Sequence, residues 1–168
     1  MKRSQFTIPP FYQNYVDLAG NDDLMKALKK STQEFKKLLK NIPRKKHDYA
    51  YGEGKWTIRQ LLQHMIDAER VFALRALWFA REEGSPLPGF DENKWADKAN
   101  QSKRKWKDLT EEFLHLRSAN EALFHSFTKE ELLKSGVASN APIAVAVLGY
   151  ICAGHLMHHI NIIKERYL

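Results

Sequence analysis

Histidine is the residue type in this chain whose positions most clearly suggest chemistry. Three of the seven histidines fall within five residues near the C-terminal end, at positions 155, 158 and 159. Successive residues of a helix are rotated by about 100°, so His155 and His159 share one face, one turn apart, and His158 lies closer to the rim of that face. Two imidazoles at this spacing can bind one metal ion, or they can be hydrogen-bonded residues of a core.

A third candidate ligand, His64, lies within an apolar helical stripe, next to Leu61, Met65 and Ala68. A buried imidazole must satisfy its N–H and its lone pair locally or bind something. For His64 alone, a core histidine with local hydrogen bonds is the favoured interpretation. Three such residues on two helices favour a metal site instead, because helical bundles build such sites from facing helices.

Three neutral imidazoles leave at least one coordination position open, which is the pattern of a catalytic metal site. Water or a substrate thiolate can fill that position. Ligation by nitrogen alone suits one divalent ion of Zn, Ni, Fe or Co and does not choose among them. The single cysteine, Cys152, excludes a disulfide scaffold and a cysteine-rich zinc module. It lies one turn from His155, so a Cys–His pair is conceivable, although buried free cysteines are usually inert.

Four amphipathic helices are predicted to position these residues. The first spans about residues 21–41, with Asn21 as N-cap and a stop at Pro43. The second begins at a capping box formed by Thr57 and Gln60 and continues to about residue 83. The third spans about residues 107–127, after a connection of residues 84–106 that is long enough to be functional or packed down.

The fourth helix is predicted to begin at Ser139 or Asn140, with Pro142 in its first turn, and to continue almost to the C-terminus. No convincing strand pattern is present. The expected fold is therefore all-α, a four-helix bundle in residues 21–168. Residues 1–20 are expected to form an extended N-terminal arm, because Pro9 and Pro10 disfavour a helix.

The net charge of +7 is confined to one part of the chain. Residues 1–46 hold eleven Lys or Arg against four Asp or Glu, and the remainder is neutral. A nucleic-acid contact through the first helix is one interpretation, but a solvated helix face is favoured. The apolar run at residues 141–154 is shorter than the roughly 20 residues that a membrane span needs. With no secretory signal pattern at the N-terminus, we expect a cytoplasmic protein without a membrane segment.

Three segments together resemble the DinB superfamily, and within it the DinB-like group. Residues 64–70 read HMIDAER, residues 154–159 read GHLMHH, and residues 86–92 read PLPGFDE. The resemblance covers about residues 21–168. It implies a four-helix bundle of the DinB/YfiT-like type with up-down-down-up topology, often as a homodimer. It also implies one divalent metal ion held by three histidines, which in this chain are His64, His155 and His159.

The resemblance further implies a metal-dependent enzyme that acts on a small molecule, either a hydrolase or a transferase that uses a low-molecular-weight thiol. His158 is a partner or an alternative ligand. Asp67 forms a hydrogen bond with one of the metal ligands, pairs with a facing cation, or is a charge of the helix surface. Family members often have an acidic residue where this chain has Leu156. That difference gives weight to the alternative of a metal- or ligand-binding stress-response module without turnover.

Overall fold

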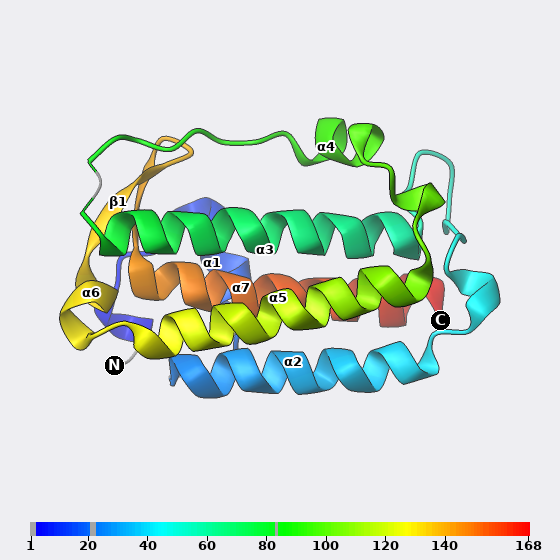
Figure 1. The fold of residues 1–168 in the computed structure, drawn as a ribbon, viewed down its shortest axis with the longest axis horizontal. Coiled ribbons are helices and arrows are strands. Elements are labelled where there is room, and N and C mark those ends of the chain that lie inside the picture. The colour runs from blue at the N-terminus through cyan, green and yellow to red at the C-terminus, as the bar shows by residue number, and fades with distance from the viewer. Residues whose placement is uncertain (1–2, 21–22, 83) are drawn as a thin grey trace.

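The computed structural model describes residues 3–20, 23–82 and 84–168 (Figure 1). Its α-helices are α1 (Gln13–Leu18), α2 (Leu24–Asn41), α3 (Ile58–Ala80), α4 (Glu92–Lys98), α5 (Trp106–Ser126), α6 (Lys129–Leu133) and α7 (Val145–Ile162). A π-helical turn, Ile163–Tyr167, continues α7, and short 3-10 turns lie at Arg3–Gln5, Pro10–Tyr12, Arg44–Lys46 and Gln101–Lys103. The two strands are β1 (Ser135–Ala138) and β2 (Ala141–Ala144).

The four long helices α2, α3, α5 and α7 form the bundle and confirm the predicted fold class. In Figure 1, α2 and α7 progress in one direction and α3 and α5 in the other, which is an up-down-down-up topology. The two parallel helices α3 and α5 cannot be joined by a tight turn. The connection between them therefore returns along the outside of α3 and carries α4.

Side-chain caps explain where several of these helices begin. Asp23 accepts a hydrogen bond from the backbone N–H of Lys26 at 2.9 Å, and so caps α2. The predicted cap, Asn21, lies outside the described residues. Thr57 and Gln60 form the predicted capping box at the start of α3. Asp91 caps α4, because its side chain accepts hydrogen bonds from the backbone N–H groups two and three residues later in the chain.

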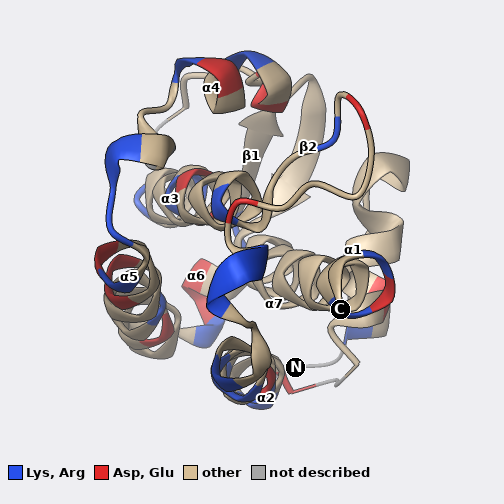
Figure 2. Cartoon of the chain, turned by 90° about the vertical axis from the view of Figure 1, so that its right-hand side faces the viewer, with Lys and Arg blue, Asp and Glu red and all other residues tan. Residues whose placement is uncertain are grey.

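The helix α7 is the central element of the core. It is apolar all round, and α2, α3 and α1 pack against it. Val145–Tyr167 is long and apolar enough to cross a membrane, but 78% of that apolar window is buried inside the fold, as in the core helix of a globular domain. Figure 2 shows Lys, Arg, Asp and Glu on the outward faces of α2, α4 and α5, whereas α7 carries none of them within Val145–Ile162.

The prediction of a wholly extended N-terminal arm was wrong, because Gln13–Leu18 forms α1 directly after Pro9 and Pro10. The prolines restrict only the residues beside them, and the apolar side of α1 gains a place against α7. The approach is very close: a Cβ at Gly154 would lie 1.5 Å from the carbonyl oxygen of Tyr15. Only glycine at this position of α7 allows α1 to lie there.

The predicted start of the fourth helix at Ser139 or Asn140 was also wrong. Residues 135–144 form an antiparallel hairpin in which Ala138 pairs with Ala141, and α7 begins only at Val145. Ser139 and Asn140 both have positive φ, 52° and 62°, which suits a two-residue hairpin turn. The absence of an Asn-Gly signal hid this turn in the sequence, although Asn tolerates such a backbone conformation.

The hairpin also holds the long connection in place. Leu87 forms a parallel bridge with Ala138, through backbone hydrogen bonds of 2.9 and 3.2 Å to the neighbouring residues Val137 and Ser139. The segment that follows Leu87 is thereby placed beside the bundle, over the part of α3 and α7 that carries the histidines. The connection predicted to be functional or packed down is therefore packed against the fold.

Candidate metal centre

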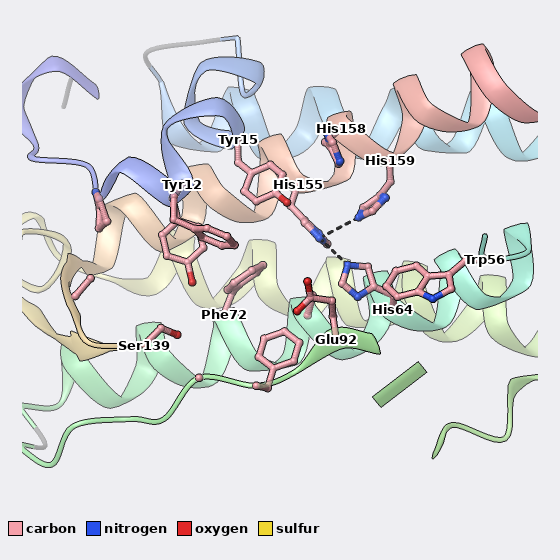
Figure 3. Close-up of a pocket in the computed structure, with 16 residues that line it drawn as sticks. Tyr12, Tyr15, Trp56, His64, Phe72, Glu92, Ser139, His155, His158 and His159 are labelled. Carbon is pink, nitrogen blue, oxygen red and sulfur yellow. Dashed lines mark hydrogen bonds between the residues drawn. The ribbon is translucent and has the colours of Figure 1, made fainter. Parts of the chain in front are cut away.

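The three histidines singled out in the sequence meet inside the bundle. The Nε2 atoms of His64 and His155 lie 3.0 Å apart, and those of His155 and His159 lie 3.1 Å apart (Figure 3). One ring nitrogen of each residue lies within 4.8 Å of the other two. The α3 helix supplies His64, and the spacing of one helical turn on α7 brings His155 and His159 to the same side.

Burial keeps these three imidazoles neutral. His155 and His159 are each 5% exposed, and burial lowers the pKa of both well below the ordinary value of 6.5. Burial also lowers the pKa of His64, to about 4, with a smaller contribution from His158. Neutral imidazoles offer lone pairs, which is the protonation state that a metal ligand requires.

The hydrogen-bond pattern of the cluster cannot be completed by the three rings themselves. The Nε2 atom of His155 faces two other Nε2 atoms, yet it carries either one proton or one lone pair and can serve only one of them well. In addition, the buried Nδ1 atom of His159 has no hydrogen-bond partner in the described part of the chain. A cation among the three Nε2 atoms would satisfy the converging lone pairs, so the donor set fits a divalent metal ion.

The two other candidates from the sequence, His158 and Asp67, do not lie at the same site: one is beside the three histidines and the other is not. His158 is half-buried beside the cluster, where its ring contacts those of Tyr15 and His159 at centroid distances of 5.3 and 5.0 Å. Asp67 accepts a hydrogen bond from Gln63 at 3.0 Å, and burial raises its pKa. It lines a separate hollow next to α4 and forms no hydrogen bond with the three histidines among the described interactions.

A cavity of about 590 Å³ opens onto the three histidines. Its walls are mainly aromatic and come from five regions of the chain: the N-terminal segment with α1, α3 with the residue Trp56 before it, the connection up to the first residue of α4, the hairpin, and α7 (Figure 3). The lining residues beyond the histidines include Phe11, Tyr12, Tyr15, Trp56, Phe72, Phe90, Glu92 and Ser139. A volume of this size is typical of sites for small molecules.

Glu92 is a functional candidate that sequence reasoning missed. It is the one acidic residue among the described residues that line the cavity, and Figure 3 shows its carboxylate in the cavity between Phe72 and His64. Burial and the charge of Glu92 both raise the pKa of Tyr15 above its ordinary value of 10.0, so this phenol stays protonated well above neutral pH. The segment of residues 86–92 contributed to the family resemblance but indicated no role for Glu92, and only the tertiary fold brings this residue to the cavity.

Cys152 is a fully buried residue with its pKa raised well above the usual value, mainly by burial and then by the charge of Glu69. It does not line the cavity. The nearby buried ion pair between Glu69 and Arg117, with an oxygen–nitrogen distance of 2.6 Å, links α3 to α5. These contacts support the interpretation of Cys152 as an inert core residue, since reactive thiols have lowered pKa values and access to solvent.

The sequence model of the DinB superfamily matches residues 27–163. The chain belongs to the DinB superfamily. A Geobacillus kaustophilus protein named "Putative metal-dependent hydrolase" is 32% identical over 117 residues, which are 65% of this chain and 62% of that protein. A Bacillus cereus protein of the same name is 28% identical over 138 residues, 79% of each chain. The chain thus spans less than two thirds of the Geobacillus relative.

Two solved structures share the fold of this DinB-superfamily chain. YfiT from Bacillus subtilis, described as a probable metal-dependent hydrolase with an unusual four-helix bundle topology, superposes with a TM-score of 0.73. That match has 18% identity and covers 95% of this chain and 87% of YfiT. A mycothiol-dependent maleylpyruvate isomerase superposes with a TM-score of 0.64 at 12% identity, covering 92% of this chain and 60% of the isomerase. At these identities the likeness shows the fold alone.

Proposed function

We propose that this protein is a metal-dependent hydrolase that acts on a small, largely apolar molecule in the aromatic cavity. The observation that carries the proposal is the convergence of three neutral imidazoles, two buried and one half-buried, at the end of that cavity. His64, His155 and His159 would hold one divalent ion, of Zn, Ni, Fe or Co. When bound, such an ion supplies a Lewis acid with at least one open coordination position.

The other residues of the cavity have separable tasks in this proposal. Glu92, whose carboxylate lies in the cavity beside His64, accepts the proton of the attacking nucleophile. The protonated phenol of Tyr15 is available as a hydrogen-bond donor on the opposite side of the histidines. Phe72 and Phe90 provide apolar walls that hold the substrate and limit the access of water.

Elemental analysis of tag-free protein tests the metal site. We expect one equivalent of metal in the wild type and none in the triple variant His64→Gln, His155→Gln, His159→Gln. The double variant His115→Gln, His125→Gln is the matched control, since both residues are exposed on α5. Equal, substoichiometric metal in the wild type and the triple variant would overturn the proposal.

The reaction itself is tested by a screen of aryl and alkyl esters and amides, with and without low-molecular-weight thiols. We expect hydrolysis without thiol, and a loss of about a hundredfold or more in Glu92→Gln with its metal content unchanged. Turnover that requires a thiol would replace hydrolysis with thiol transfer. Stoichiometric metal without turnover would favour a non-catalytic binding module. The homodimer and the cytoplasmic location stay predictions from the sequence.

A further inference from the structure

Arg75 on α3 is a buried arginine that forms no ion pair with a carboxylate among the described residues. It is 1% exposed, and its guanidinium donates to the carbonyl of Pro88 at 2.8 Å, to Ser139 Oγ at 3.0 Å and to the Tyr12 hydroxyl at 3.3 Å. All three acceptors are neutral. Arg117, the other fully buried arginine, has a carboxylate oxygen at 2.6 Å. Because a buried charge without a counter-charge is unfavourable, a nearby anion would be stabilised at Arg75.

The hydroxyl groups of Tyr12 and Ser139 transmit this charge to the cavity. Each accepts a hydrogen bond from Arg75, and neither donates one to any of the residues that the structure describes. A hydroxyl that accepts from a cation has its own O–H free and polarised for donation. Both residues line the cavity, and Figure 3 shows their hydroxyl oxygens close to the same part of it. They form what we term the Tyr12–Ser139 hydroxyl pair.

The cavity therefore has two chemically different ends. The three histidines and the Glu92 carboxylate occupy one end, and the hydroxyl pair lies at the hairpin end, with Phe72 between them (Figure 3). No Lys or Arg is among the described residues that line the cavity, so the positive charge reaches a ligand through the two hydroxyls. Gly89 lies close to the Ser139 hydroxyl: a Cβ added at Gly89 would be 3.4 Å from Ser139 Oγ.

We propose that the Tyr12–Ser139 hydroxyl pair, backed by Arg75, binds a carboxylate group of the ligand. The ligand class is a small organic acid with an apolar body, whose carboxylate lies at the hairpin end and whose other end reaches the histidines. This assignment rests on the proposed function only in one respect, namely that the reacting group of the ligand lies at the histidines. The carboxylate site itself is built from residues that are not metal candidates, and so it can be tested without metal.

The test uses three probes that share one body and differ in charge: 3-phenylpropanoate, 3-phenylpropan-1-ol and 3-phenylpropan-1-amine. Each is titrated into chelator-treated protein and into protein loaded with zinc, with binding followed by amide chemical shifts, which also locate the probe. In both forms we expect the carboxylate to bind at least tenfold more tightly than the alcohol, and the amine to bind most weakly. The largest shifts should lie at the hairpin turn.

Tyr12→Phe with Ser139→Ala removes both hydroxyls and leaves Arg75 and the aromatic wall in place. We expect this double variant to bind the carboxylate about tenfold more weakly and the alcohol within about twofold of the wild type. The matched control is Tyr49→Phe with Ser126→Ala, because both residues lie outside the cavity. It should change neither the affinity for the carboxylate nor the affinity for the alcohol.

Equal affinity for the carboxylate and the alcohol would overturn the assignment, as would an equal loss of all three probes in the double variant. A carboxylate preference that occurs only with zinc, or that maps to another surface, would overturn it too. The outcome is separable from that of the proposed function. If the wild type holds no more metal than the triple histidine variant, the hydrolase proposal is refuted, but the preference of metal-free protein for the carboxylate is unaffected.

Discussion

Acid should destabilise the metal-free fold through His64. Burial lowers the pKa of this imidazole from 6.5 to about 4, so the folded protein keeps His64 neutral while the unfolded chain binds a proton. Between pH 6.5 and pH 4 the unfolded state therefore holds more protons at this site. The contribution of His64 to stability is complete above pH 6.5 and is lost as the pH falls through that window.

The size of this effect follows from the difference between the two pKa values. Each pKa unit corresponds to about 1.4 kcal/mol, so a lowering of about 2.5 gives roughly 3.4 kcal/mol once the pH is well below 4. At pH 5, where the titration of the unfolded chain is nearly complete, the loss is about 2 kcal/mol. His64 is largely buried, so solvent screening reduces this value little.

Urea unfolding of chelator-treated protein at pH 7.5 and pH 5 measures the loss. The wild type should lose about 2 kcal/mol more than His64→Gln, because the substitution removes this titrating group, while the groups away from it are common to both proteins and cancel in the difference. The exposed-residue variant His115→Gln should behave like the wild type. Losses that agree within about 0.5 kcal/mol in the wild type and His64→Gln would refute the reasoning that burial holds His64 neutral.

Two further predictions concern the framework of the site. Glu69→Gln leaves Arg117 buried without an ionised partner and should lower the free energy of unfolding by about 3–5 kcal/mol in urea titrations. Glu34→Gln, which removes the carboxylate of an exposed ion pair, is the control and should change this free energy little. Equal losses in the two variants would contradict the prediction. Gly154→Ala places a Cβ 1.5 Å from the Tyr15 carbonyl oxygen and should cost about 1–3 kcal/mol or more in thermal unfolding. Gly84→Ala, which has open space, is its control, and equal melting temperatures would show that α1 does not depend on this contact.

The sequence by itself determined the bundle and the histidine cluster. Apolar positions at helical spacing predict α2, α3, α5 and α7, and the cap formed by Thr57 and Gln60 was located correctly. The geometry of a helix turn also placed His155 and His159 on one face before any tertiary contact was known. These features were accessible because they depend on local periodicity and local hydrogen bonds.

The tertiary structure decided the cavity around that cluster. The α1 helix, the hairpin and the position of Glu92 each depend on contacts between residues far apart in the chain, such as Tyr15 with Gly154 and Leu87 with Ala138. No local pattern encodes such contacts, and short elements take their conformation from the surface they pack against. The role of the Tyr12 and Ser139 hydroxyls also depends on contacts between distant residues, because it arises only from the buried charge of Arg75 behind them.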